Sequence, residues 1–291
     1  MEPTSTDEAI VSGPGEGELL RGRNRTFLVK VARPELSLIE YDAGPDYEGA
    51  SPHFHERHTD AFYVLAGELE FTLGRETVLA PAGTAVVAPP GVVHALTNAS
   101  GARVRFLNIH APDAGFAGYI RAATRGEGGT FDSVDVDGPQ EPGGGTVLGP
   151  GEGMAFEVGT ASSLFKATRE ATAGFFSLAE TTLEPETSGP PLHSHRELLD
   201  SFYVLEGMLT IQVGDDELEA IPGTYAYVPP GVVHTFANPS SAPVRILNLN
   251  LPGGWEDYIR DLAAAIPAGG QPDPTLMGEV LARHDVVLAS G

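Results

Sequence analysis

The chain has 291 residues, with 17 Lys and Arg against 40 Asp and Glu, which gives a formal net charge of −23. So acidic a surface repels phosphate backbones and anionic membranes, which argues against nucleic acid and membranes as partners. There are no cysteines, so any metal must be held by His, Asp or Glu. The first 25 residues lack a basic start followed by an apolar run, which predicts a cytoplasmic protein.

The elements predicted along the chain are mostly β-strands. The 36 Gly and 24 Pro are spread between short apolar runs, which favours an all-β fold with tight turns. Gly67 and Gly207 each divide an apolar run, as a hairpin would require. Strands are predicted at 25–32, 36–41, 61–73, 84–90 and 103–110, and helices at 115–124, 255–266 and 276–284.

An internal repeat organises the sequence. Residues 53–69 align with 193–209, with nine identities in 17 positions, and residues 83–98 align with 223–238, with nine identities in 16. Both alignments have the same offset of 140 residues, so no insertion separates the two blocks in either copy. Each copy is therefore predicted to be one structural unit.

The segment between the copies is rich in Gly and acidic residues and lacks apolar periodicity. This composition is typical of a linker or a surface loop. We therefore predict a first domain at 1–140, a linker at about 125–148 and a second domain at 149–291.

Six of the nine histidines occupy repeated positions. His53 and His55 are two residues apart on a predicted strand, so both imidazoles point to one face. Asp60 begins the next strand, and His94 follows a Pro-Pro-Gly turn. The predicted metal ligands are His53, His55, Asp60 and His94 in the first copy, and His193, His195, Asp200 and His234 in the second.

Three imidazoles and one carboxylate suit a divalent transition metal, namely Fe, Ni, Mn, Co, Cu or Zn, with one or two positions left for water or substrate. Alternatively, these histidines are ordinary interior residues that form hydrogen bonds. Their repetition in register favours the metal, with one ion expected in each copy.

The repeated motifs resemble those of bicupins, which carry two cupin barrels in one chain. The second cupin motif is matched in full by Gly83, Pro89, Gly91, His94 and Asn98, and by Gly223, Pro229, Gly231, His234 and Asn238. The first motif is matched by His53, His55 and Gly67, and by His193, His195 and Gly207. The resemblance implies two tandem double-stranded β-helix (jelly-roll) barrels that bind metal, with the helices flanking them, and it extends to quercetin 2,3-dioxygenase-like (pirin/quercetinase-type) bicupins.

Two features depart from the cupin pattern. The opening Gly of the first motif is replaced by Tyr47 and Thr187, and Asp60 and Asp200 stand where the family usually has Glu. The shorter carboxylate either coordinates the metal with altered geometry or acts as a base. In quercetinase-like bicupins the equivalent Glu accepts the substrate proton, so the resemblance makes Asp60 and Asp200 the candidate catalytic residues.

The predicted pocket is mainly apolar and aromatic, which suits a planar or apolar substrate better than a sugar phosphate. Its predicted lining is Phe62, Phe71 and Leu96 in the first copy, and Phe202, Tyr225, Tyr227 and Phe236 in the second. His58 and His110 have Leu198 and Asn250 as repeat partners. We therefore expect neither histidine to bind metal, His58 to lie in an exposed loop, and the acidic run 132–137 to be solvated.

Three functions are compatible with these residues. The first is a metal-dependent dioxygenase similar to quercetin 2,3-dioxygenase, which cleaves a flavonol or related enolisable aromatic compound with O2. The second is a non-redox isomerase, lyase or cyclase that acts on a small-molecule or polyketide-like carbonyl compound, with the metal as Lewis acid. The third is a non-catalytic bicupin that binds a ligand. The sequence leaves open whether the chain is a monomer or a homodimer.

Overall fold

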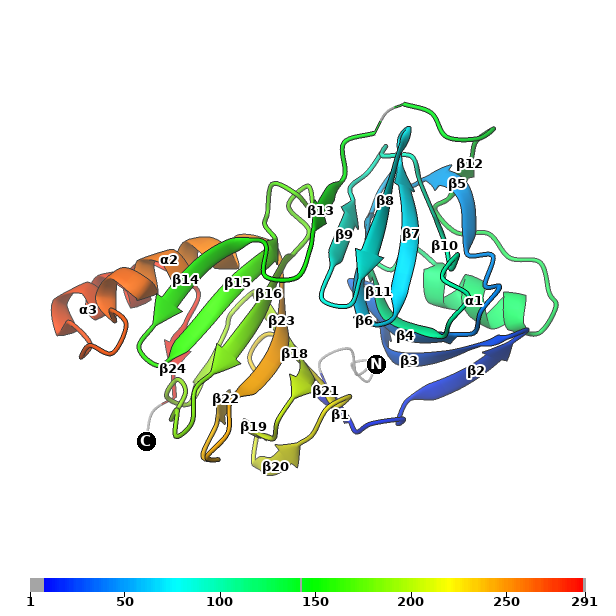
Figure 1. The fold of residues 1–291 in the computed structure, drawn as a ribbon. Helices are drawn as coiled ribbons and strands as arrows, with labels where there is room; N and C mark the ends of the chain where they lie inside the picture. Colours follow the sequence, from blue (N-terminus) through cyan, green and yellow to red (C-terminus); the bar gives the residue numbers. More distant parts are fainter. Residues whose placement is uncertain (1–7, 142, 290–291) are drawn as a thin grey trace, which may run out of the picture. The chain divides into compact units, whose positions relative to one another are not determined.

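The computed structural model describes residues 8–141 and 143–289, and these form two β-barrels (Figure 1). Each barrel consists of a seven-stranded and a five-stranded antiparallel sheet, which confirms the predicted all-β class. Among the described residues, no helix combines the length and the apolar character needed to cross a bilayer.

The first barrel is drawn from blue to green in Figure 1. Its larger sheet has the order β13-β9-β6-β11-β4-β3-β2, and its smaller sheet has the order β12-β5-β10-β7-β8. The strands are β2 (Glu18–Gly22), β3 (Arg25–Arg33), β4 (Leu36–Ala43), β5 (Ala50–Phe54), β6 (Thr59–Ala66), β7 (Glu68–Leu73), β8 (Glu76–Pro81), β9 (Ala85–Ala88), β10 (His94–Thr97), β11 (Val104–Ala111), β12 (Val134–Asp135) and β13 (Thr146–Leu148).

The second barrel repeats this arrangement with the orders β1-β21-β18-β23-β16-β15-β14 and β20-β19-β22-β17-β24. Its strands are β1 (Ile10–Ser12), β14 (Met154–Val158), β15 (Ala161–Ala167), β16 (Ser177–Leu183), β17 (His193–Ser194), β18 (Leu199–Glu206), β19 (Leu209–Val213), β20 (Asp216–Ala220), β21 (Tyr225–Val228), β22 (His234–Ala237), β23 (Val244–Leu251) and β24 (Val287–Leu288).

Alternation along the strands builds each barrel's core, because every second side chain points inward. In the first barrel, Phe62 and Val64 of β6 meet Phe71 of β7. In the second, Phe202 of β18 and Ile211 of β19 occupy the same places. All five side chains are at most 3% exposed, so these positions supply the apolar burial that stabilises the barrels.

In the part of the chain that the structure describes, three helices flank the barrels, close to the predicted ranges: α1 (Phe116–Thr124), α2 (Trp255–Ala265) and α3 (Pro274–Arg283). Helix α3 begins earlier than predicted, because the Asp273 side chain caps it by accepting hydrogen bonds from the backbone N–H groups of Thr275 and Leu276. Phe116 and Ile120 of α1 pack into the first core, whereas Tyr258 of α2 packs on Val280 of α3.

The contacts divide the chain differently from the predicted boundary. Residues 16–152 and 170–175 form one unit, and residues 1–15, 153–169 and 176–291 form the other. Strands β12 and β13 fall within the predicted linker but pair with β5 and β9 of the first barrel, while β1 pairs with β21 of the second. These pairings did not follow from the sequence, because composition does not reveal which strand will pair with the edge of a sheet.

Gly67 also differs from its expected role. Strands β6 and β7 on either side of it belong to different sheets, so they do not form a hairpin. Gly67 has a φ of +79°, and a Cβ there would lie 2.7 Å from the Arg103 carbonyl oxygen. Only glycine fits this corner, where the chain passes from one sheet to the other.

Candidate metal centres

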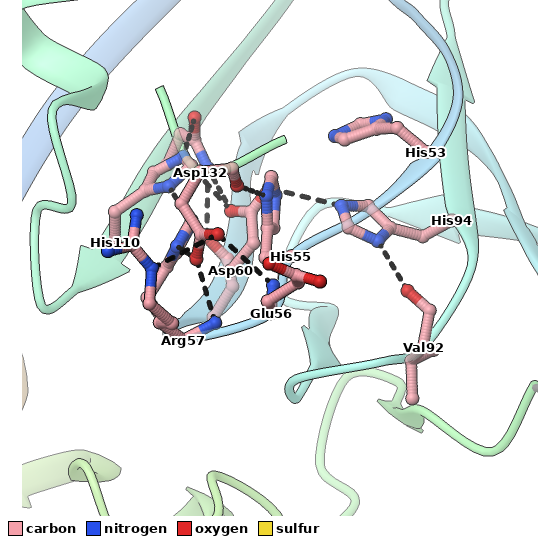
Figure 2. Close-up of polar contacts among 12 residues, drawn as sticks. His53, His55, Glu56, Arg57, Asp60, Val92, His94, His110 and Asp132 are labelled. Atoms are coloured by element: carbon pink, nitrogen blue, oxygen red, sulfur yellow. Dashed lines mark hydrogen bonds and ion pairs between the residues drawn. The ribbon is translucent and has the colours of Figure 1, made fainter. Parts of the chain in front are cut away.

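The predicted ligands of the first barrel converge inside it (Figure 2). His53 on β5 pairs with His94 on β10, and His55 and Asp60 follow on the loop after β5 and on β6. All four residues are at most 7% exposed. One potential ligand atom of each lies within 4.8 Å of the others, so the group has the dimensions of a single-ion site.

Backbone carbonyls hold the three imidazoles in one tautomer. Nδ1 of His53 donates to the Ser51 carbonyl at 2.7 Å, and Nδ1 of His94 donates to the Val92 carbonyl at 3.0 Å. Nδ1 of His55 donates to the Asp132 carbonyl. Because a carbonyl can only accept, the proton of each neutral ring sits on Nδ1 and the lone pair of Nε2 is left for a metal.

Asp60 completes this arrangement with a carboxylate. Its Oδ2 lies 3.3 Å from Nε2 of His94 and 3.6 Å from Nε2 of His55, while its Oδ1 accepts a 2.5 Å hydrogen bond from Nδ2 of Asn108. Burial raises the pKa of Asp60, but His110 and the contacts with His55 and His94 outweigh it, so the pKa lies well below its usual range. Asp60 is therefore an anion at neutral pH.

The second barrel repeats the centre. Nδ1 of His193 and of His234 each donates to a backbone carbonyl at 3.0 Å, that of Pro191 and of Val232 respectively. Nδ1 of His195 donates to the Asp285 carbonyl. Oδ2 of Asp200 lies 3.3 Å from Nε2 of His234 and 3.9 Å from Nε2 of His195. The same acceptor atoms thus converge in both barrels.

The unpaired nitrogen atoms of both histidine groups indicate that these residues suit a metal ion. Nε2 of His55 and Nε2 of His195 are buried and have no hydrogen-bond partner among the described residues. Burial, then neighbouring histidines, lowers the pKa of His53 and of His193 to about 4, so both stay neutral at pH 7. Neutral lone pairs facing a carboxylate lack a donor, and a cation supplies the missing partner.

A row of further polar groups continues from Asp60 in the first barrel only. Nε2 of His110 lies 3.3 Å from Oδ1 of Asp60, and Nδ1 of His110 lies 2.8 Å from Nε2 of His58. Nδ1 of His58 donates to Oδ2 of Asp132 at 2.9 Å. His58 is 0% exposed and Asp132 6%, which corrects the expectation of an exposed loop histidine and, for Asp132, that of a solvated acidic run; Asp135 and Asp137 of that run are exposed as expected.

In the second barrel the row is interrupted. Leu198 and Asn250 replace the two histidines, and Asn250 donates to Oδ1 of Asp200 at 2.8 Å. Asp285 takes the place of Asp132, with its carboxylate accepting from the backbone N–H groups of Arg196, Glu197 and Leu198 at 2.8–3.0 Å. The two centres therefore share their ligands and differ in what supports the carboxylate.

A cavity of about 660 Å³ opens onto the first centre and includes His53 and Asp60 in its lining. Of the predicted lining residues, Phe62 and Leu96 lie on this cavity, whereas Phe71 packs against Phe62 with ring centroids 5.0 Å apart and is 0% exposed. The further aromatic residues around it are Phe27, Tyr41, Tyr47, Phe106, Phe116, Tyr119 and Phe131.

The second barrel has a smaller cavity of about 190 Å³, lined by Trp255 and Tyr258. The predicted residues Phe202 and Phe236 lie in the barrel core, with ring centroids 5.2 Å apart. Tyr225 and Tyr227 were predicted to line the pocket, and the structure corrects this prediction. In the register, Phe202 lies opposite Ala226 and Asp200 lies opposite Val228, so the two tyrosines occupy the other face of the sheet.

Four residues around the centres, His58, His110, Asp132 and Asp285, did not follow from the sequence. For His110 a signal existed, because it lies two residues from Asn108 and so on the same strand face. The difference between His110 and its repeat partner Asn250 marks where the two barrels diverge. Asp132 and Asp285 carry no such signal, since both reach their centres from outside the aligned blocks.

Comparison with known proteins supports this architecture. Residues 39–110 and 179–250 each match the Cupin_2 family of cupin domains. Quercetin 2,3-dioxygenase of Bacillus subtilis (strain 168) is 28% identical over 116 residues, which is 40% of this chain and 34% of that protein. The match thus spans about a third of the length of this relative.

Solved structures share the fold at low identity. A putative glyoxylate induced protein from Pseudomonas aeruginosa has a TM-score of 0.63 at 17% identity, covering 84% of this chain and 88% of that one. The oxalate decarboxylase–formate complex of Lactobacillus farciminis has a TM-score of 0.60 at 12% identity, covering 87% and 88%. With two matched cupin domains and two barrels that repeat one metal-ligand pattern, the chain belongs to the cupins and is a bicupin.

Proposed function

We propose that the first barrel is a metal-dependent dioxygenase that cleaves a flavonol or a related enolisable aromatic compound with O2, as an oxidoreductase resembling quercetin 2,3-dioxygenase. The observation that carries the proposal is the 660 Å³ cavity, in which aromatic side chains and the metal-ligand group meet. This volume suits a multi-ring organic molecule. The sequence similarity to the quercetin 2,3-dioxygenase of Bacillus subtilis points to the same chemistry.

The walls of the cavity orient a flat substrate. Tyr41 stacks on Phe106 with ring centroids 4.5 Å apart, and Phe27 meets Tyr41 edge-on at 4.8 Å. Such walls favour a planar ring and exclude water from the reacting end. The cavity therefore presents one edge of a ring to His53 and Asp60.

A divalent transition metal held by the three Nε2 atoms and Asp60 would make the enol oxygen of the substrate more acidic and promote its reaction with O2. Asp60 is ionised and buried, so its Oδ2 can accept the enol proton. Asn108 holds Oδ1 at 2.5 Å and keeps Oδ2 directed toward the histidines. In this proposal Asp60 is the catalytic base of the first barrel, and Asp200 is its counterpart in the second.

The differences between the barrels support the first one as the catalytic barrel. The smaller cavity of the second barrel does not include its metal-ligand residues in its lining. Its carboxylate Asp200 is held by two amides, from Asn248 and Asn250, at 2.5 and 2.8 Å. Side-chain amides do not act as acids or bases near neutral pH, so we assign the second metal a structural role.

Oxygen uptake by the metal-loaded protein with quercetin tests the proposal, with the bound metal quantified and His94→Ala and His234→Ala measured in parallel. We expect uptake to disappear in His94→Ala and to persist in His234→Ala. Loss in His234→Ala alone would assign catalysis to the second barrel. Absence of uptake by protein that carries metal would exclude quercetin as the substrate.

The row of histidines behind Asp60 favours a second candidate, a non-redox isomerase, lyase or cyclase acting on a carbonyl compound. An ionised carboxylate in contact with His110, which in turn contacts His58, is suited to repeated proton transfer. Such an enzyme would exchange the hydrogen next to the substrate carbonyl with D2O without consuming O2. Nuclear magnetic resonance of the product separates the two candidates.

A further inference from the structure

Positive charge is gathered at the cavity of the first barrel, although the chain has a net charge of −23. Arg21, Arg23 and Arg25 all line the cavity, and they lie at the end of β2, in the turn and at the start of β3. Arg21 and Arg23 are exposed, whereas Arg25 is half-buried. Asp60 and Asp135 also line the cavity, so its guanidinium groups outnumber its carboxylates by one and favour anions at this site.

Arg25 is directed into the barrel rather than toward solvent. It shares the inward face of β3 with Phe27 and Val29, because alternate residues of a strand point the same way. Its guanidinium carbon lies 5.4 Å from the ring centroid of Phe27 and 5.3 Å from that of Tyr47. Both aromatic residues line the cavity, so they fix the guanidinium against its wall.

The hydrogen-bonding capacity of Arg25 is not used up within the protein. Its Nε is buried and has no hydrogen-bond partner among the residues that the structure describes. Leaving a buried charged donor without an acceptor costs free energy. A ligand with anionic oxygen atoms would supply the acceptor.

At the equivalent place, the second barrel has neither the arginine nor the aromatic wall. Arg25 lies opposite Ala43 in the first barrel, and Ala161 lies opposite Leu183 in the second. Ala161 therefore occupies the position equivalent to Arg25. Two residues further along β3, Phe27 lies opposite Tyr41 of β4 in the first barrel. Ser163 and Thr181 replace them in the second and share a hydrogen bond of 3.1 Å between their hydroxyls. Arg25 and its aromatic neighbours are thus a feature of the first barrel's cavity.

We propose that the first barrel takes a planar aromatic acid, whose carboxylate pairs with Arg25 while its ring lies along the aromatic wall. This inference rests on the proposed function, whose substrate it narrows to an enolisable aromatic compound that carries a carboxylate. A guanidinium and a carboxylate match in a two-point hydrogen-bonded geometry. Asp60 lines the same cavity and repels the carboxylate, so the acid is oriented with its uncharged end toward the metal-ligand group.

Isothermal titration calorimetry with two probes of matched shape tests this inference. The zinc-loaded protein is titrated with trans-cinnamate and with trans-cinnamamide, which differ mainly in charge. We expect the wild-type protein to bind the acid about tenfold more tightly than the amide, as expected for one charged hydrogen-bonded pair. In Arg25→Gln the two affinities become equal, and Arg25→Lys retains part of the preference.

Arg75→Gln is the matched control, because Arg75 is exposed and lies outside the cavity lining while the change in net charge is the same. It should leave the preference unchanged, and thermal unfolding verifies that each variant is folded. Equal affinities in the wild-type protein would overturn the inference. A preference that survives in Arg25→Gln but vanishes on removal of zinc would place the carboxylate on the metal instead.

Two further outcomes are decisive. If acetate displaces cinnamate at equal concentration, the cavity recognises anions without recognising the ring, and the aromatic class is wrong. Calorimetry requires no oxygen chemistry, so failure of the proposed dioxygenase is distinguishable from failure of this inference. A protein that binds cinnamate through Arg25 but consumes no O2 with any enolisable acid would retain the substrate class and lose the dioxygenase.

Discussion

His110 and His58 are hydrogen-bonded to each other in the interior of the first barrel, with Nδ1 of one 2.8 Å from Nε2 of the other. Asp132 accepts from Nδ1 of His58, so Nε2 of His58 is the acceptor and His110 donates to it. Nε2 of His110 then faces oxygen atoms of Asp60 and Asn108 at 3.3 and 3.2 Å. Asp60 is thus backed by two imidazoles, whose rings are tilted by 36° with centroids 4.9 Å apart.

Replacing these histidines by the residues of the second barrel tests their role. We expect His110→Asn and His58→Leu each to lower kcat by at least about tenfold, the usual lower range for losing support of an acid–base group. Metal content and KM should change little, because neither residue belongs to the four-residue group of His53, His55, Asp60 and His94, although His58 and His110 form a further cluster with His55. An unchanged kcat in both variants would show that His110 and His58 contribute to the structure and not to catalysis.

Each barrel is predicted to bind one metal ion through its own ligands. Inductively coupled plasma mass spectrometry should give two ions per chain for the wild-type protein, one for His53→Ala and one for His193→Ala. His284→Ala is the control, because His284 pairs with Asp261 at 2.8 Å and lies outside both ligand groups. One ion in the wild-type protein would show that a single centre is loaded.

The metal-free protein should lose stability as the pH falls from about 6.5 toward 4. Burial lowers the pKa of His53 and of His193 to about 4, so in this range the unfolded chain binds protons that the folded chain does not. The free energy of unfolding then falls by up to about 1.4 kcal/mol per pH unit for each histidine. Above pH 6.5 these two histidines should no longer change the free energy of unfolding, because they are neutral in both states.

Urea unfolding at pH 7, 6 and 5 after chelation measures this dependence. The double variant His53→Gln, His193→Gln should show a shallower fall, since Gln does not titrate. If the wild-type slope matched that of the variant, the two histidines would be protonated equally in the folded and unfolded chain.

Asp285 ties the C-terminal segment to the second centre, and its loss should destabilise that barrel. Its carboxylate accepts three backbone hydrogen bonds, and its carbonyl accepts from His195. We expect Asp285→Ala to cost about 2–4 kcal/mol in the free energy of unfolding, because three N–H groups lose a charged acceptor. Glu279→Ala on the exposed face of α3 should cost less than about 0.5 kcal/mol. Equal, small effects would contradict this role.

The repeat and the local strand pattern were enough to predict two all-β units and both ligand groups, and the resemblance to bicupins implied that each unit is a barrel. His53 and His55 share a strand face by alternation, and the constant offset of 140 residues carries the assignment from one copy to the other. These are periodicities of the chain itself, so no contact between distant segments is needed to find them. The helices near 115–124 and 255–266 followed from the same kind of local pattern.

The tertiary structure decided what distant segments bring to each centre. Asp132 and Asp285 reach His55 and His195 across 77 and 90 residues of sequence, and no local pattern encodes such pairings. The face of Tyr225 and Tyr227 depended on the pairing register, in which a shift of one residue reverses every side chain. The gathering of Arg25, Phe27 and Tyr47 around one cavity likewise arises only when β2, β3 and β4 close the barrel, because burial is a property of the packed chain.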